Sequence, residues 1–246
     1  DEDLYVAHLE RETNTLYVND GSGNFVDAST ASGLAAPSWR YTGFGSGFFD
    51  YDNDGRLDLL TVNGAVKVIK SLALAGDPYP LHQRNLLFHQ RADGSFEDVT
   101  ASAGPAFELS EVSRGAAFGD LDNDGDADVV ISNNHGPARL LRNLVGQDRP
   151  WLGLRLVDRR GRDLIGARAA LTLADGSRRW RRVLTTWSYA SSSDPRLVFG
   201  LGDRSGDPRE PAKIVVEWPD GQREEFDEVA AGAYTTLMER TFAPGT

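Results

Sequence analysis

Short runs of apolar residues alternate with turn-forming residues along the whole chain. Runs such as LDLLTV and ADVVIS are bounded by Asp-Gly and Gly-Ser pairs, a pattern typical of strands joined by hairpin turns. The segment VKVIKSLAL at 66–74 has a helical pattern instead, and the helix breakers Pro78 and Pro80 follow it. The pattern therefore predicts an all-β protein with one short amphipathic helix.

The first part of the chain contains a repeat. FFDYDNDGRLDLLTVNG at 48–64 recurs as FGDLDNDGDADVVISNN at 118–134, and the opening DEDLYVAHL matches the end of the same unit. The middle copy carries an insertion around 65–83. A repeat of roughly 50 to 70 residues with about four short strands is typical of propeller blades, because one such unit cannot bury its own face. About two and a half units cannot close a propeller, so we expect upstream blades or neighbouring chains to cover the exposed face.

The pattern changes at Trp151. Six segments from there on read as strands, which predicts a separate small β-sandwich or barrel. A boundary within VGQDRP divides the chain into incomplete repeats at 1–146 and a second domain at 147–246. The strand-like segments are WLGLRLV, GARAALTL, RRWRRVLTTW, RLVFGLG, AKIVVEWP and GAYTTLMER.

Charge separates the two parts as well. Of the formal net charge of -11, residues 1–148 carry -13 (23 acidic, 10 basic) and residues 149–246 carry +2 (14 acidic, 16 basic). Such acidity argues against a nucleic-acid partner. The absence of cysteine excludes disulfides, thiolate metal sites and cysteine nucleophiles. The apolar runs are too short to span a membrane, and the first residues read as a strand, so we expect any export signal to lie outside this chain.

Nine of the acidic residues belong to two loops with identical spacing. Aspartate occupies positions 1, 3, 5 and 9 of each loop, glycine occupies position 6, and the carbonyl at position 7 can add a further oxygen. The predicted metal ligands are Asp50, Asp52, Asp54, Arg56 (carbonyl) and Asp58 in the first loop, and Asp120, Asp122, Asp124, Asp126 (carbonyl) and Asp128 in the second. Calcium accepts six to eight oxygens at flexible angles, whereas zinc prefers nitrogen or sulfur, so the loops predict about two Ca²⁺ sites.

The flanks distinguish these loops from helix-flanked calcium hands. A calcium hand needs a bidentate glutamate at position 12, where this chain has Thr61 and Ile131, and the flanking segments are strand-like. We therefore expect the loops within β-hairpins. A single such loop could be a solvated acidic turn, but two copies in register favour metal binding. The same comparison identifies Asp3 as the last ligand of a third loop.

The loops and the strands around them resemble the FG-GAP or VCBS repeats of integrin-type propellers. The segments GRDLIGARAALTLADG, TTWSYASSSDPRLVFGLGD and AKIVVEWPDGQ follow the order found in the ASPIC/UnbV domain. Nearly the whole chain is thus similar to the cartilage acidic protein-like family. The resemblance implies propeller-type blades, a C-terminal β domain and extracellular calcium-binding interaction modules. The stretch ASSSDP departs from the family pattern, in which a glutamine often occurs, and no polar role is assigned there.

Other candidate sites have simpler interpretations. His8, His82, His89 and His135 lack metal-ligand spacing and are interpreted as surface or core residues. The glycines of GFGSGFF at 43–49 are expected to let strands pack closely, because the phosphate-loop lysine and helix are missing. The arginines at 178–182 should divide between two faces of a strand. They could bind a polyanion, but a solvated strand with arginines stacked on Trp180 is favoured.

These observations favour a non-enzymatic, secreted or cell-surface module in which Ca²⁺ makes the repeats rigid. Its partners would be a protein, a glycan or further copies of the chain. Two alternatives remain. The chain could be a non-catalytic, glycan-binding region of a larger secreted enzyme, or a subunit of an extracellular fibre whose unpaired strands associate.

Overall fold

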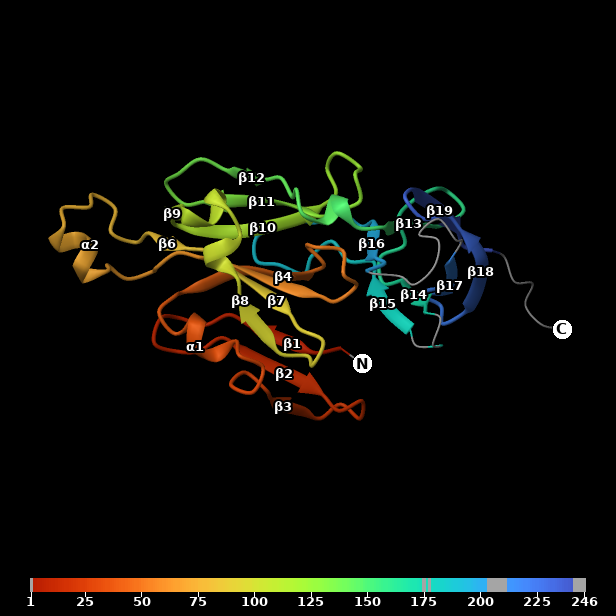
Figure 1. The fold of residues 1–246 in the computed structure, drawn as a ribbon, viewed down its shortest axis with the longest axis horizontal. Coiled ribbons are helices and arrows are strands. Elements are labelled where there is room, and N and C mark those ends of the chain that lie inside the picture. Colours follow the sequence, from red (N-terminus) through yellow and green to blue (C-terminus); the bar gives the residue numbers. More distant parts are fainter. Residues whose placement is uncertain (1, 174–175, 177, 203–211, 241–246) are drawn as a thin grey trace.

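The structure is a computed structural model that describes residues 2–173, 176, 178–202 and 212–240. Strands dominate this part of the chain, and its two α-helices span only four and five residues. Figure 1 shows the strands in two groups, one formed before residue 145 and the other after residue 150. The all-β prediction is confirmed. No helix among the described residues is long and apolar enough to span a membrane.

Three antiparallel sheets and one two-stranded pair form the first group in the described residues. The sheets are β1 (Leu4–Val6), β2 (Thr15–Asn19) and β3 (Phe25–Asp27); β4 (Gly43–Phe49), β5 (Asp58–Asn63), β7 (Leu86–Gln90) and β8 (Phe96–Asp98); and β10 (Ser113–Gly119), β11 (Asp128–Asn133) and β12 (Arg139–Leu141). The pair is β6 (Gln83–Arg84) with β9 (Ser110–Glu111). The three sheets follow chain order, except that β6 lies between the neighbours β5 and β7. The sequence repeats are therefore blade-like sheets, and the middle blade has four strands.

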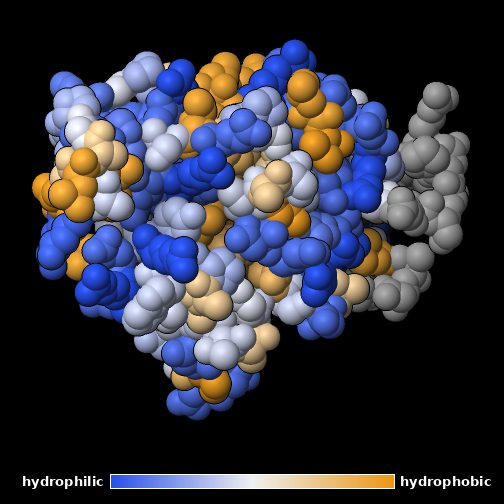
Figure 2. Space-filling model, turned by 60° about the vertical axis from the view of Figure 1, so that its left-hand side comes forward, coloured by the Kyte–Doolittle hydropathy of each residue, from blue (hydrophilic) through white to orange (hydrophobic). Residues whose placement is uncertain are grey.

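The predicted insertion lies between β5 and β7 and projects from the body of the molecule (Figure 1). It contains α2 (Lys70–Leu74), within the predicted helical segment, and β6, which pairs with β9. Figure 2, with this side turned forward, shows hydrophobic residues in separate patches among hydrophilic ones. The remaining helical elements are α1 (Ala35–Ser38), η1 (Thr100–Ser102), η2 (Pro105–Glu108) and η3 (Gly146–Asp148).

Strands β4 and β10, the first strands of the second and third blades, pack closely through glycine. A Cβ at Gly45 would lie 2.6 Å from the backbone nitrogen of Ala116, and a Cβ at Gly47 would lie 2.6 Å from Cε2 of Phe118. Only glycine permits this approach. The interpretation of GFGSGFF as a close-packing strand is confirmed.

Two sheets form the second group and bury an apolar core. One contains β13 (Trp151–Val157), β16 (Leu197–Gly200) and β19 (Tyr234–Met238), with β19 parallel to β13. The other contains β14 (Arg168–Thr172), β15 (Arg178–Arg182), β17 (Ala212–Glu217) and β18 (Arg223–Val229). Leu154, Ala169 and Ile214 are fully buried in this core. The predicted small β domain is present, with seven strands in the described residues instead of six.

The C-terminal domain has its own apolar core and also contacts the blades. Its segment 185–194 lies along β10, where the amide of Asp194 donates to the carbonyl of Phe118 at 2.9 Å. Trp187 stacks on Phe118 with ring centroids 4.8 Å apart, and Tyr189 contacts Phe44 edge-on at 5.2 Å. The chain therefore covers part of its blade surface with its own C-terminal domain, because these aromatic side chains bury apolar area on both sides.

Candidate metal centre

The two aspartate loops connect the first and second strands of their blades. Register pairs Phe49 with Asp58 at the base of the first loop and Gly119 with Asp128 at the base of the second. Both loops are therefore hairpin loops, as their strand-like flanks predicted. Position 9 is the first residue of the outgoing strand in each.

Backbone conformation explains the tight curvature of the loops. Asn53 and Asn123 at position 4 have φ of 55° and 61°, a left-handed region that asparagine tolerates better than most residues. Gly55 and Gly125 at position 6 have φ of 91° and 94°, which strongly favours glycine. Each loop thus turns twice, and its side chains at positions 1, 3 and 5 point toward one centre.

The carboxylates at these three positions converge in both loops. Their oxygens lie within 4.8 Å of one another, in the groups Asp50, Asp52, Asp54 and Asp120, Asp122, Asp124. Oδ1 of Asp50 and Oδ2 of Asp124 are buried without a hydrogen-bond partner. Burial of an unpartnered carboxylate oxygen is costly unless a cation compensates it. The donor set is hard oxygen, so the residues present fit a calcium ion.

Burial perturbs the first aspartate of the first loop. Desolvation raises the pKa of Asp50 to about 6, against the lowering effect of Arg181 and with further repulsion from Asp54 and Asp52. Without a cation, the buried carboxyl group of Asp50 therefore resists ionisation. A divalent ion would remove that resistance by supplying positive charge at the centre.

Position 9 has a second role that the spacing did not reveal. Oδ1 of Asp58 accepts a 2.8 Å hydrogen bond from the amide of Gln90, and Oδ2 accepts a 3.1 Å bond from Tyr51. Asp58 is completely buried. This side chain therefore joins the start of the loop to the end of β7, on the third strand of the same blade.

The third blade repeats this arrangement. Oδ1 of Asp128 accepts from the amide of Asn143 at 2.8 Å, and Oδ2 accepts from Leu121 at 3.1 Å. In the first blade, Oδ1 of Asp3 accepts from the amide of Asn19 at 2.9 Å. Asp3 thus occupies the predicted place in the repeat, while its role as a metal ligand stays a prediction.

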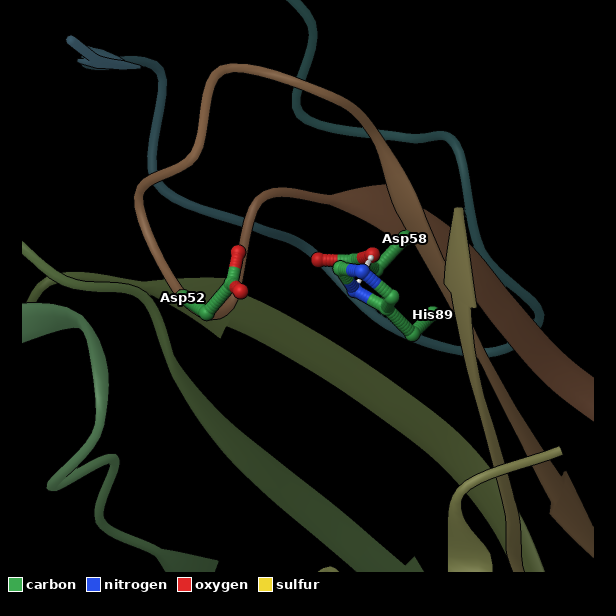
Figure 3. Close-up of side chains that lie close together, drawn as sticks. All are labelled: Asp52, Asp58 and His89. Carbon is green, nitrogen blue, oxygen red and sulfur yellow. Dashed lines mark ion pairs between the residues drawn. The ribbon is translucent and has the colours of Figure 1, made fainter. Parts of the chain in front are cut away.

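His89 lies beside the first loop, although the spacing of the histidines gave no sign of it. Figure 3 shows its imidazole against Asp58, with Asp52 nearby, and ligand atoms of these three residues lie within 4.8 Å of one another. Its Nδ1 is 3.1 Å from Oδ1 of Asp58, an ion-pair distance without hydrogen-bond geometry. A neutral imidazole there could add one nitrogen ligand. The repeat alignment, which places His89 on the strand next to the loop, was the available signal.

The equivalent place in the second loop holds an arginine. Arg142 precedes Asn143 as His89 precedes Gln90, and its Nη2 lies 2.6 Å from Oδ2 of Asp122 and 3.8 Å from Oδ2 of Asp124. The two loops therefore share their aspartates but differ in the neighbouring side chain.

The residues at position 7 use their side chains as well. Arg56 pairs with Asp54 and donates through Nε to the carbonyl of Gln90 at 2.8 Å. Asp126 is completely buried, and its Oδ2 accepts from the amide of Gln147 at 3.1 Å. Desolvation, followed by repulsion from Asp124, raises the pKa of Asp126 to about 7. Metal binding through the carbonyls of both residues stays a prediction.

The arginine strand β15 does not match the favoured solvated interpretation. Its side chains divide between two faces as expected, but the side chain of Arg181 is only 14% exposed and faces the first loop, with Nη2 3.9 Å from Oδ2 of Asp50. Arg179 packs against Gly55 of that loop, where a Cβ would lie 1.5 Å from its Nη1. The arginine stacked on Trp180 is Arg168, at 4.7 Å from the ring centroid. The sequence alone could not show that β15 covers the first loop.

Between the two loops and the C-terminal domain lies a cleft of about 250 Å³. Its lining includes Asp50, Asp120, Trp180, Trp187 and Tyr234. The C-terminal domain therefore closes over the first aspartate of each loop.

Ser193, within the stretch ASSSDP to which no polar role was assigned from the sequence, makes a polar contact with the third blade. Its hydroxyl is buried and accepts a 3.1 Å hydrogen bond from the amide of Phe118. This contact helps to hold segment 185–194 against β10.

Comparison with known families matches both parts of the chain. Residues 1–61 and 72–131 match the model of the FG-GAP-like repeat, and residues 158–243 match the model described as ASPIC and UnbV. The two metal loops lie within the FG-GAP-like matches, while Tyr234 and β15 lie within the ASPIC and UnbV match.

Three curated relatives carry one name, cartilage acidic protein 1. The chain is 24% identical to the protein from Homo sapiens over 94% of this chain and 40% of that protein, and 23% identical to that from Mus musculus over 87% and 39%. Identity to the protein from Xenopus tropicalis is 39% over 56 residues, 23% of this chain and 8% of that protein. The chain therefore spans about two fifths of the length of the human and mouse relatives.

Proposed function

The chain belongs to the proteins that join FG-GAP-like repeats to an ASPIC and UnbV domain, and from this premise we propose that it is a non-enzymatic, extracellular calcium-binding interaction module. Calcium bound in the two loops makes the blade hairpins rigid. The surface so formed serves to contact a protein or glycan partner.

The observation that carries this proposal is the set of unpartnered carboxylate oxygens in matched loops. Oδ1 of Asp50 and Oδ2 of Asp124 are buried and lack hydrogen-bond partners, and each belongs to a triad of aspartates. Among the described residues neither oxygen accepts a hydrogen bond, and the nearest cation to that of Asp124 is Nη2 of Arg142 at 3.8 Å. A hard divalent cation satisfies them without requiring any further protein group.

Bound calcium supplies positive charge to groups that otherwise repel one another. The aspartates at positions 1, 3, 5 and 9 would hold it, with His89 as an added candidate at the first loop. Two ions change the formal charge of the chain from -11 to -7, since each contributes two positive charges. We expect affinities of about 0.1 to 1 mM, as in other extracellular calcium modules, so the sites would fill outside a cell.

The non-enzymatic assignment is supported by how the carboxylates of the cleft are used. Asp50 and Asp120 belong to the loops, and Oδ2 of Asp194 is paired with Arg196 at 2.6 Å. Paired acid catalysis requires a carboxylate free to exchange a proton with a substrate. Once calcium occupies the loops, none of these three described side chains would be free in that sense.

Isothermal titration calorimetry tests the proposal directly. We expect two calcium ions to bind the wild-type chain and none to bind the double variant Asp52→Asn, Asp122→Asn. Melting in calcium and in excess chelator should give a higher midpoint with calcium for the wild type only. Glu228→Gln, which removes one exposed acid far from the loops in sequence, serves as the control for charge. An unchanged wild-type midpoint, or calcium binding by the double variant, would contradict the proposal.

A further inference from the structure

The first aspartate of each loop uses its two oxygens differently. Oδ2 of Asp50 accepts a 2.8 Å hydrogen bond from the amide of Gly55, and Oδ2 of Asp120 accepts a 2.9 Å bond from Gly125. Oδ1 of Asp50 has no partner, and Oδ1 of Asp120 accepts only a 3.2 Å bond from Asp124. In both loops Oδ2 is therefore fixed by the protein, which leaves Oδ1 for a metal ion.

The C-terminal domain places a side chain against the fixed oxygen in both cases, through a hydrogen bond at Asp120 and an ion pair at Asp50. The hydroxyl of Tyr234 donates to Oδ2 of Asp120 at 2.7 Å. The guanidinium of Arg181 lies 3.9 Å from Oδ2 of Asp50. Tyr234 begins β19 and Arg181 lies within β15, so two different sheets of that domain supply the two side chains.

We propose that Tyr234 and Arg181 are positioning residues for the metal ligands of the two loops, so that calcium binding and docking of the C-terminal domain stabilise each other. The inference rests on the proposed calcium binding and extends it to the second domain. Partners of metal ligands fix the orientation of those ligands and commonly change metal affinity 10- to 100-fold. The coupling is reciprocal: if docking of the C-terminal domain increases calcium affinity by a given factor, calcium binding favours docking by the same factor.

Contacts to the loop backbones hold the same domain in register. Arg196 donates to the carbonyl of Asp120 at 2.6 Å and to Oδ1 of Asn123 at 2.5 Å. On the first loop, the amide of Gly202 donates to the carbonyl of Asn53 at 2.9 Å. Each loop is thus held by the C-terminal domain at a ligand side chain and also at its main chain.

Among the described residues, the side-chain polar partners of Tyr234 and Arg181 are the loop aspartates. The hydroxyl of Tyr234 makes its one described hydrogen bond to Asp120. Arg181 donates to the carbonyl of Trp180 at 3.1 Å and only weakly, at 3.5 Å, to that of Gly55. Burying a guanidinium is costly: burial lowers the pKa of Arg181, and the carboxylates of Asp50 and then Asp58, both in the first loop, oppose that effect. Docking without the first loop in place would leave Arg181 without these two charges.

Calorimetry in single-site backgrounds tests the assignment. Asp52→Asn isolates the second loop, and Asp122→Asn isolates the first. We expect Tyr234→Phe to weaken calcium binding about 10-fold at the second loop and to leave the first unchanged, with Arg181→Gln doing the reverse. Tyr189→Phe and Arg182→Gln are matched controls, because Tyr189 packs on Phe44 at the same interface and Arg182 pairs with Glu2 instead of a loop.

Hydrogen exchange measured by mass spectrometry gives the reciprocal readout. In the wild type, calcium should slow amide exchange in β15 and β19, which contain no metal ligand. This protection should shrink in Tyr234→Phe and in Arg181→Gln, but not in the two controls.

The outcomes separate the two proposals. If the wild type binds no calcium, the proposed function fails. If it binds calcium but Tyr234→Phe matches Tyr189→Phe, or weakens both loops equally, the positioning role is overturned and calcium binding stands. Circular dichroism in chelator identifies a variant that has lost its fold. If Tyr234→Phe is that variant, Arg181→Gln provides the test at the first loop, where a selective loss of affinity supports positioning and an equal loss at both loops overturns it.

Discussion

Asp58 and Asp128 make the same two hydrogen bonds in successive blades. Each accepts a 3.1 Å bond from an amide at the start of its own loop. Each also accepts a 2.8 Å bond from an amide at or just after the end of the blade's third strand, Gln90 in β7 and Asn143 two residues beyond β12. These aspartates therefore connect three parts of a blade with or without a metal ion. The other loop aspartates do not share this arrangement.

Replacing Asp58 should therefore destabilise even the metal-free chain. In Asp58→Asn, an amide nitrogen replaces one acceptor oxygen and faces a backbone N–H. The native carboxyl group of Asp58 can accept both backbone hydrogen bonds whether it is protonated or ionised. We expect the free energy of unfolding in chelator to fall by about 1 to 3 kcal/mol. Asp52→Asn, which weakens a partly exposed pair with Arg149 and keeps an acceptor oxygen for the long 3.3 Å bond from the amide of Asp54, should cost less than about 1 kcal/mol. Equal losses in urea titrations of the two variants would refute this distinction.

Stability and calcium affinity should depend on pH in opposite ways. Burial raises the pKa of Asp50 to about 6 and that of Asp58 to about 8, while Asp126 has a raised pKa of about 7. Unfolded aspartates titrate near 4, so the folded metal-free chain holds protons that the unfolded chain has released. The contribution of these groups is complete below about pH 4 and is lost as the pH rises through 6 to 8.

Calcium must displace the same protons, so its affinity should increase over that range. The gap between melting midpoints in calcium and in excess chelator should widen from pH 6 to 8.5. A constant gap across this interval would show that these aspartates do not titrate with the metal.

Gly125→Ala should be more harmful than an equivalent change at an open turn. Gly125 has φ of 94°, and a Cβ there would lie 1.9 Å from Cε2 of the rigid indole of Trp151. Gly94 has φ of 83° with nothing within 4 Å of its Cβ position. Both substitutions incur the backbone penalty of about 1 kcal/mol, and we expect Gly125→Ala to lose about 1 to 3 kcal/mol more. Urea denaturation in calcium compares the two variants. Equal losses in the free energy of unfolding would mean that Trp151 moves aside at little cost.

Arg142→Gln should increase calcium affinity at the second loop. The guanidinium of Arg142 competes for the oxygens of Asp122 and Asp124, and its side chain is 59% exposed. An exposed pair of this kind contributes less than about 1 kcal/mol, so we expect a gain of about 2- to 5-fold. Titration in the Asp52→Asn background isolates this site. Weaker binding would instead identify Arg142 as a residue that orders the loop.

The sequence predicted what is local. A nine-residue hairpin loop carries its own geometry, so the spacing of Asp50, Asp52 and Asp54 was enough to foresee that their oxygens converge. Likewise, the glycines of β4 indicated close packing before the neighbouring strand was known. The strands followed from the alternation of apolar runs and turn residues. The insertion followed from comparing the copies of the repeat.

Groups that meet across long stretches of chain were not foreseen. Tyr234 reaches Asp120 over 114 residues, and no pattern near either residue indicates the other. The alternation of β15 correctly divided its arginines between two faces, but the loop that Arg181 covers is set only by the packing of whole domains. His89 lies between these cases, since its position follows from the repeat but its orientation does not.

The contact of segment 185–194 with β10 bears on how such a protein can be inherited and recombined. A genetic exchange near residue 150 would join intact repeats to an intact C-terminal domain, yet it would also exchange the partner of Phe118. Trp187 and Ser193 of the incoming part would meet a strand of different shape. The repeats and the C-terminal domain can therefore be inherited as separate segments of DNA. Their contact surfaces nevertheless have to fit each other for the two parts to pack as they do here.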